Sequence, residues 1–330
     1  MRRYLLFTLI VGVVFSFILL HFSFAAQNNS LRVPVQGSSV SKRIISEEQI
    51  DEINRLGLHI DPSILALKEL KKEPLQIDHE KVVEKAICAL EVQIANGVKV
   101  PWLHYDIIGG SSSIVKSPNP EITMDKLKPK LLGEIKAAAR KKNIDFYADV
   151  HLMVEEVDEG LIGEYISEGA DYITLHYEGY IDKNALKDRI LFINDSDKCK
   201  AGLAFNPDID IETIIDFVSK NELRNHIYLF LQMTVYPGEG AQKFMKEVLP
   251  NITKLKNKFG SSVLLQVDGG INGDTIGEAV KAGANLFVSG SSFFGKEGQA
   301  FSEVESNLIN IFSGIPSSIP NISVLSRDNM

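Results

Sequence analysis

Cysteine is scarce in this sequence, with only Cys88 and Cys199 among 330 residues. Two thiols cannot build a disulfide framework or a zinc module held by four cysteines, and we expect two separate small apolar side chains rather than a bridge. A surplus of positive charge is also missing, because 35 basic residues stand against 43 acidic ones. The net charge of −8 argues against broad contact with nucleic acid phosphates. Apolar residues at 45% and charged residues at 24% exclude a disordered or fibrous protein.

Asp and Glu are absent from the first 46 residues, so all 43 acidic side chains lie in the rest of the chain. Arg2 and Arg3 precede an apolar run over 4–20, which ends near a pair of alanines. A basic start, an apolar middle and a small-residue exit are typical of a secretory signal peptide. The run is nearly as long as the roughly 20 residues that cross a bilayer. Residues 1–26 are therefore predicted to be a signal peptide or a membrane anchor.

The next segment, 27–56, has too few apolar residues to fold alone and is predicted to be a solvated linker. Its lack of acidic residues up to position 46 also allows a second targeting element behind the signal peptide. We expect the chain to enter the secretory route, as an exported or membrane-tethered protein. The alternative is an organelle reached through a bipartite signal.

Beyond the linker, short apolar runs alternate with amphipathic stretches. No Gly-x-Gly-x-x-Gly opens the first helical stretch, which disfavours a dinucleotide-binding sheet. Eight strand–helix units over about 250 residues fit a (β/α)8 barrel, or TIM barrel, over residues 57–312. A loose tail is expected over 313–330. The predicted strands are Leu58–Ile60, Trp102–Ile107, Asp145–Val150, Tyr172–His176, Ala201–Phe205, Tyr228–Met233, Val263–Val267 and Leu286–Ser289.

Polar residues interrupt the apolar runs where three predicted strands end. His104 and Asp106 are two residues apart and share one face of their strand, His151 ends the third strand, and Asp268 ends the seventh. Chemistry in a TIM barrel belongs at these carboxyl ends. Each residue alone is more often a structural group or a turn residue, but two imidazoles and two carboxylates together predict a site for a divalent metal.

Glycines follow the last three predicted strands. They occur at Gly238, at Gly269 and Gly270, and at Gly290 next to Ser291. Such residues let backbone amides approach an anion, and the loops after strands seven and eight commonly hold phosphate in these barrels. The alternative for each is an ordinary glycine turn.

Five motifs resemble the ribulose-phosphate 3-epimerase family in order and near spacing. They are Asp61-Pro62-Ser63-Ile64-Leu65, His104-Tyr105-Asp106, Asp149-Val150-His151-Leu152-Met153, Met233-Thr234-Val235-Tyr236-Pro237-Gly238 and Val267-Asp268-Gly269-Gly270-Ile271. The resemblance runs from about residue 58 to Gly295. It implies a metal-dependent enzyme that interconverts D-ribulose 5-phosphate and D-xylulose 5-phosphate.

The resemblance also implies roles for single residues. The metal ligands would be His104, Asp106, His151 and Asp268, and both aspartates would form the acid–base pair. One divalent ion per chain is implied, and Zn²⁺, Fe²⁺, Mn²⁺ and Co²⁺ all suit this donor set. The implied substrate-binding residues are Ser63, His151, Met153, His176, Gly238, Gly269, Gly270, Gly290 and Ser291.

Epimerisation at C3 explains why two carboxylates are needed. A proton leaves the carbon next to the C2 carbonyl, an enediolate forms, and a proton returns to the opposite face. One base cannot easily reach both faces, so an acid on each side of the sugar suits the reaction. Both then need pKa values near the working pH, which burial and mutual coupling can provide.

Departures from the family pattern leave the substrate open. Ile107-Ile108-Gly109-Gly110 stands where the family usually has Val-Met-Asp-Gly, and Tyr236 stands where Asn is usual. An epimerase of another ketose phosphate, such as a hexulose 6-phosphate, is therefore an alternative. The signal-like segment allows a second one, a non-catalytic exported binder of sugar phosphates. A phosphorylated ketose is the expected partner, assembly into a homo-oligomer is left open, and nucleic acid is not expected.

Overall fold

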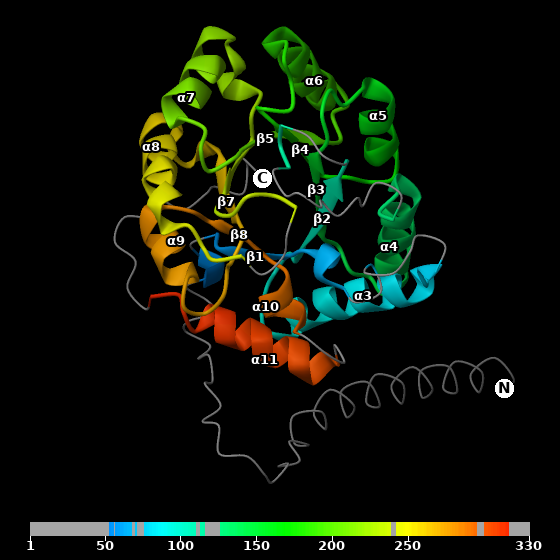
Figure 1. The fold of residues 1–330 in the computed structure, drawn as a ribbon. Coiled ribbons are helices and arrows are strands. Elements are labelled where there is room, and N and C mark those ends of the chain that lie inside the picture. Colours follow the sequence, from blue (N-terminus) through cyan, green and yellow to red (C-terminus); the bar gives the residue numbers. More distant parts are fainter. Residues whose placement is uncertain are drawn as a thin grey trace, which may run out of the picture. The chain divides into compact units, whose positions relative to one another are not determined.

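The computed structural model describes residues 53–55, 57–67, 70, 76–109, 113–115, 126–238, 242–295 and 300–316 (Figure 1). The predicted signal peptide or anchor, nearly all of the predicted linker and most of the predicted tail lie outside these residues. Those assignments stay predictions.

Eight parallel strands form one sheet in the order β1-β8-β7-β6-β5-β4-β3-β2. Ser63, just after β1, makes a parallel bridge to His104 of β2, which brings the two ends of the sheet together. The strands are β1 (His59–Pro62), β2 (Trp102–Ile108), β3 (Tyr147–Met153), β4 (Tyr172–His176), β5 (Lys200–Phe205), β6 (Leu229–Met233), β7 (Leu264–Asp268) and β8 (Leu286–Ser289). The predicted TIM barrel is confirmed.

Helices surround the strands, and at least one helix follows each strand along the chain (Figure 1). The α-helices are α3 (His79–Ala95), α4 (Pro129–Lys141), α5 (Glu159–Ser167), α6 (Lys183–Asp195), α7 (Ile211–Lys220), α8 (Leu249–Phe259), α9 (Ile276–Ala282), α10 (Ser291–Phe294) and α11 (Phe301–Phe312). Short 3-10 helices are η1 (Ile64–Ala66), η4 (Leu223–Asn225), η5 (Lys246–Val248) and η6 (Gly260–Ser262).

Aspartates set the starts of four of these helices. The side chains of Asp78, Asp158, Asp182 and Asp210 each accept a hydrogen bond from a backbone N–H in the first turn of α3, α5, α6 and α7. Each such cap satisfies a backbone donor that the helix itself leaves unpaired, typically for about 1 kcal/mol of stability. The βα loops are thereby fixed at the end of the barrel where the strands finish.

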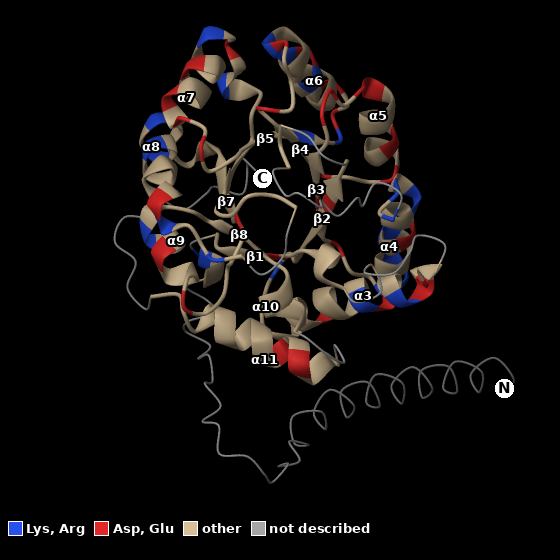
Figure 2. Ribbon diagram, in the orientation of Figure 1, with Lys and Arg blue, Asp and Glu red and all other residues tan. Residues whose placement is uncertain are grey.

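The core has two layers because the strands alternate between two faces. Outward residues such as Tyr105 and Val150 belong to a large apolar cluster shared with the helices. Inside the barrel, a smaller cluster includes Trp102, Tyr172 and Leu231. Charged residues colour the outer helices, whereas the strands are mostly free of them (Figure 2). The charged side chains that do occur inside the barrel therefore need an explanation.

Differences from the predicted boundaries have local causes. The amphipathic stretch over 125–140 predicts a helix along its whole length, but α4 begins only at Pro129, because the residue before a proline is disfavoured in helical geometry and Lys128 is extended. The amphipathic stretch over 244–258 likewise predicts a helix along its whole length, but α8 begins only at Leu249, since the Met245 N–H instead donates to the carbonyl of Thr234. Cys88 and Cys199 are separate free thiols, as expected.

Within the described residues, every helix is too short or too polar to traverse a lipid bilayer.

Candidate metal centre and active site

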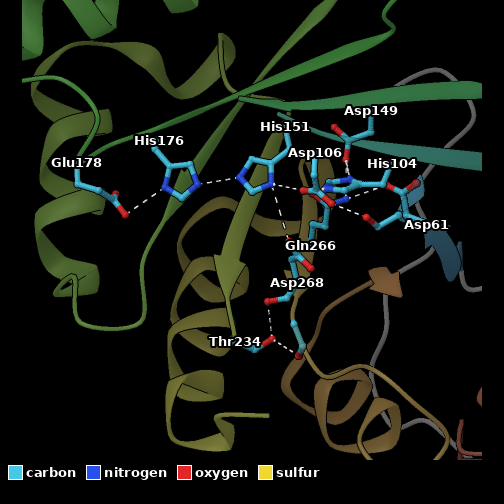
Figure 3. Close-up of polar contacts among 12 residues, drawn as sticks. Asp61, His104, Asp106, Asp149, His151, His176, Glu178, Thr234, Gln266 and Asp268 are labelled. Atoms are coloured by element: carbon cyan, nitrogen blue, oxygen red, sulfur yellow. Dashed lines mark hydrogen bonds and ion pairs between the residues drawn. The ribbon is translucent and has the colours of Figure 1, made fainter. Parts of the chain in front are cut away.

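Four side chains with metal-binding atoms meet at the carboxyl ends of three strands (Figure 3). His104 Nε2 and His151 Nδ1 each lie 3.1 Å from Asp106 Oδ1. His151 Nδ1 lies 3.9 Å from Asp268 Oδ2. One ligand atom from each of the four residues lies within 4.8 Å of the others. The structure thus brings together the four residues that the sequence predicts.

The strand register explains this convergence. His104 and Asp106 are two residues apart on β2 and therefore project from the same face. Asp106 pairs in register with His151 on β3, so these side chains are neighbours. Asp268 is the last residue of β7 and reaches the same point from across the barrel. A shift of any one strand by one residue would turn its ligand away.

The spacing fits a divalent ion. Nitrogen and oxygen ligands bound at 2.0–2.2 Å in tetrahedral geometry lie about 3.3–3.6 Å from one another. The separations of 3.1 to 3.9 Å between the named atoms bracket this range. Two imidazole nitrogens and two carboxylates suit zinc, iron, manganese or cobalt, and the donor set does not choose among them.

Charge is strongly concentrated here. Burial alone would raise the pKa of Asp106, but the charge and hydrogen bond of His104 and the contact with His151 hold it well below its usual range. Burial alone would lower the pKa of His104, yet the carboxylates of Asp106 and Asp149 keep it well above the ordinary value. Burial lowers the pKa of His151 to about 4, so this ring is neutral at neutral pH. A neutral imidazole is the form that binds a metal.

The two carboxyl groups of the predicted acid–base pair differ in protonation. Burial and then the negative charge of Asp106 raise the pKa of Asp268 to about 8. In the metal-free protein at neutral pH, Asp106 is therefore ionised and can accept a proton, whereas Asp268 holds one that it can donate. Thr234 fixes the backbone at Asp268, since the Thr234 hydroxyl lies 2.7 Å from the carbonyl oxygens of both Asp268 and Gly269 (Figure 3).

Ser63 links β1 to this centre. Its hydroxyl donates a 2.5 Å hydrogen bond to Asp106 Oδ2, the oxygen that does not face the two histidines. Hydrogen bonds to a carboxylate favour its ionised form. Ser63 therefore helps to keep Asp106 in the state of a proton acceptor, in addition to its predicted contact with the substrate.

Behind His104 lies a second group of polar residues that the sequence analysis did not single out for a role. His104 Nδ1 lies 2.8 Å from Asp149 Oδ2 and 3.3 Å from Asp61 Oδ2. The amide of Gln266 donates to both acids, at 2.7 and 3.0 Å. All four residues are buried. The 2.8 Å separation is that of a hydrogen bond, so Asp149 holds the His104 ring with its Nε2 turned toward Asp106.

The period of two along a strand could have revealed this group. Asp61 stands two residues before Ser63, Asp149 two before His151, and Gln266 two before Asp268. Each therefore projects from the same face as a predicted site residue, one step deeper in the barrel.

His176 lies behind His151 rather than beside the four metal-binding groups. Its Nε2 is 2.8 Å from His151 Nε2, and its Nδ1 is 3.1 Å from Glu178 Oε1 (Figure 3). Both ring nitrogens thus have protein partners, and the side chain is fully buried. Its predicted contact with the substrate stays a prediction. Glu178 was missed, although its position two residues after His176 was the available signal.

Met153 closes β3 and packs with Ile108, Ile114 and Val115 at the mouth of the barrel. This apolar group includes residues of the stretch that departs from the family pattern. Its members are carbon-rich side chains, so they can shape the mouth but cannot move protons.

The predicted phosphate-binding residues follow β6, β7 and β8, at the same end of the barrel as the four metal-binding groups. Gly269 and Gly270 have positive φ values of +117° and +69°. A Cβ at Gly269 would lie 2.4 Å from a methyl of Val235, so a side chain there would clash as well as strain the backbone. Gly290 caps the four-residue helix α10, which begins at the exposed Ser291, and Gly238 ends the described part of the loop after β6.

Comparisons with known proteins agree with this geometry. The model of the ribulose-phosphate 3 epimerase family matches residues 83–294. A ribulose-phosphate 3-epimerase of Candida glabrata is 34% identical over 195 residues, which is 58% of this chain and 74% of the relative. The enzyme of that name from Buchnera aphidicola subsp. Schizaphis graminum is 35% identical over 199 residues, 59% of this chain and 76% of the relative. The one from Bacillus subtilis is 34% identical over 179 residues, 52% and 77% of the two chains.

Solved structures support the fold. A crystal structure of KGPDC from Streptococcus mutans covers 77% of this chain and 97% of its own, with a TM-score of 0.51 and 12% identity. A tryptophan synthase of Mycobacterium tuberculosis covers 82% of this chain and 99% of its own, with a TM-score of 0.51 and 9% identity. At these identities the likeness concerns the barrel alone.

Proposed function

The chain belongs to the ribulose-phosphate 3-epimerase family, and we propose that it interconverts D-ribulose 5-phosphate and D-xylulose 5-phosphate with the buried groups at the mouth of its barrel. The observation that carries the proposal is the grouping of His104, Asp106, His151 and Asp268 within 4.8 Å. These residues come from three separate strands, and their chemistry matches what epimerisation beside a carbonyl requires.

The two aspartates divide the proton transfers. Asp106 takes the C3 proton from one face of the sugar, while Asp268 delivers a proton to the other face. After one turnover Asp106 carries the proton and Asp268 is ionised, which is the state that the reverse reaction needs. Exchange of protons with water restores the starting state for another turnover in the same direction. Ser63 stabilises the ionised form of Asp106 through its hydrogen bond.

A divalent ion held by the four residues would supply positive charge that stabilises the negative oxygen of the enediolate, an effect worth several kcal/mol. The chain's own residues prepare for it. Asp149 holds the His104 ring from behind, and Gln266 ties Asp149 to Asp61, so the ligand set is fixed before any cation arrives.

Binding of the phosphate is assigned to the glycine loops after β7 and β8. Gly269, Gly270 and Gly290 follow these strands at the same end of the barrel as the acid–base pair, and glycines there let backbone N–H groups approach an anion. The apolar group of Ile108, Ile114, Val115 and Met153 would bound the sugar on the side of β2 and β3.

The test is an assay of the purified full chain with D-ribulose 5-phosphate, before and after removal of metal with a chelator. We expect conversion to D-xylulose 5-phosphate that is lost with the metal and restored by one divalent ion per chain. His104→Ala should lower the bound metal and the activity together. Faster turnover of a hexulose 6-phosphate would reassign the substrate. Full activity in chelator-treated, metal-free protein would overturn the metal mechanism.

A further inference from the structure

Three buried groups form a line that leads away from the metal-binding cluster. His151 Nε2 lies 2.8 Å from His176 Nε2, and His176 Nδ1 lies 3.1 Å from Glu178 Oε1. The two rings are 17° from parallel and their centroids are 4.9 Å apart. With the nitrogens only 2.8 Å apart, these values mean that the rings meet edge to edge, as a straight hydrogen bond requires, rather than face to face.

The far end of this line is fixed as a hydrogen-bond acceptor. Glu178 Oε1 also receives the backbone N–H of Asn206 at 2.9 Å. The backbone carbonyl of Glu178 accepts from the hydroxyl of Ser113 at 2.9 Å, and Asn206 Nδ2 donates to the carbonyl of Ile114 at 2.7 Å. The β4–α6 loop, the β5 end and the segment 113–115 therefore hold the carboxylate in place.

Burying this carboxylate is costly. The side chain is 9% exposed, and its Oε2 has no hydrogen-bond partner among the described residues. A largely buried carboxyl group that no catalytic step uses needs another reason to be present. Its position at the end of the imidazole line supplies one.

Ligation of a metal fixes the direction of every hydrogen bond in the line. His151 Nδ1 faces Asp106 and Asp268, so it must offer a lone pair to the ion, and the ring proton then lies on Nε2. That proton is donated to His176 Nε2. His176 consequently keeps its own proton on Nδ1 and donates it to Glu178.

We propose that Glu178 is a positioning residue that sets the tautomer of His176 and, through it, that of the metal ligand His151. The inference rests on the metal site of the proposed function. Without the carboxylate, His176 would be free to carry its proton on Nε2, where it would oppose the N–H of His151 across 2.8 Å. His151 would then be driven to protonate Nδ1, the atom that the ion needs.

The experiment compares Glu178→Leu, which removes the acceptor, with Glu178→Gln, which keeps an acceptor oxygen. The affinity for Co²⁺ is measured by competition with a chelator, and the tautomers are read from the ¹⁵N shifts of the histidine rings in zinc-loaded protein. We expect the leucine variant to bind Co²⁺ 10–100-fold more weakly, with His176 no longer protonated on Nδ1 alone. The glutamine variant should stay within a few-fold of the parent and keep the tautomer.

Two further variants separate positioning from loop packing. Lys183 donates to the carbonyls of Tyr177 and Tyr180 in the same loop, and its positive charge also acts on Glu178. Lys183→Met therefore loosens the loop and removes this charge, but it leaves the acceptor oxygen of Glu178 for His176 in place. It should leave the Co²⁺ affinity within about twofold and the tautomers unchanged. His176→Phe keeps a ring of similar size without nitrogens and should weaken Co²⁺ binding as the leucine variant does, which keeps the test open if Glu178→Leu does not fold.

Parent affinity and an unchanged His176 tautomer in Glu178→Leu would overturn the inference. A loss of equal size in Lys183→Met would also overturn it, since loop packing would then suffice. All readouts are taken without substrate. A parent protein that binds Co²⁺ with the expected tautomers but does not turn over ribulose 5-phosphate would reject the proposed function and leave this inference standing.

Discussion

Replacing Asp268 by Asn is the sharpest test of the two-carboxylate reaction. The amide keeps the size of the side chain and an oxygen that can bind a metal, but it cannot deliver a proton. Burial and the charge of Asp106 raise the pKa of Asp268 to about 8 in the metal-free protein, which suits this group to the proposed role of proton donor at neutral pH. Loss of a positioned general acid or base typically costs 10²–10⁴-fold, or about 3–5.5 kcal/mol in the barrier. We expect a fall in kcat of that size.

Hydrogen exchange at C3 in heavy water distinguishes a mechanism with two bases from a mechanism with one. Asp106 remains intact in the Asp268→Asn variant, so the epimer whose C3 hydrogen faces Asp106 should still exchange that hydrogen with solvent. Conversion to the other epimer should fall. Asp106→Asn should show the opposite pattern, with exchange retained only in the other epimer. The metal content of both variants is measured as a control, because both aspartates belong to the ligand set.

Two results would refute this reasoning. Exchange of the same epimer in both variants would mean that a single base serves both faces. Epimerisation within about threefold of the parent rate in Asp268→Asn would remove that residue from the proton transfers.

Three further predictions concern the groups around the acid–base pair. Ser63→Ala removes the 2.5 Å hydrogen bond to Asp106 and should lower kcat/KM by about 10–100-fold while raising the pKa of the acidic limb of the pH–rate profile; an unchanged limb would contradict this role. Thr234→Val should lower kcat about fivefold with the melting temperature nearly unchanged, because it removes only the hydrogen bonds of the hydroxyl to the carbonyls of Asp268 and Gly269. An unaltered kcat would show that these hydrogen bonds do not matter for turnover. In metal-free protein, the folded chain keeps a proton on Asp268 that the unfolded chain loses near pH 4, so this group's contribution to stability falls as the pH rises from about 4 to about 8. Thermal unfolding with chelator present should show a flatter pH dependence in Asp268→Asn, and identical curves would contradict the raised pKa.

The sequence predicts the fold and the centre of the site because both depend on local patterns. Alternation of short apolar runs and amphipathic stretches was sufficient for the eight strands, and β4 and β8 lie within their predicted bounds. His104, Asp106 and His151 were identifiable as polar residues in apolar strands, since a barrel sends its strand ends to one place. Asp268 follows from the same argument.

The groups behind the ligands could not be paired from sequence alone. Gln266 donates to both Asp61 and Asp149 only because the closed sheet brings β1, β3 and β7 across the barrel interior from one another. The contact between Glu178 and His151 through His176 depends on the register of β3 and β4. Such relations are properties of the closed sheet and leave no mark on any single segment.

β1 and β2 stand at the two ends of the sheet order, and they meet beside the proposed reaction centre. Among the described residues, β1 and β2 share no ladder, and the bridge from Ser63 to His104 is what connects them. Ser63 therefore both joins the two ends of the sheet and holds Asp106, the proposed catalytic base. A local separation of β1 from β2 would move the Ser63 hydroxyl away from Asp106, while the other strand pairs stay hydrogen-bonded. As the urea concentration rises, the turnover rate should consequently fall before the signal of global unfolding changes. The turnover rate would then report on closure of the barrel.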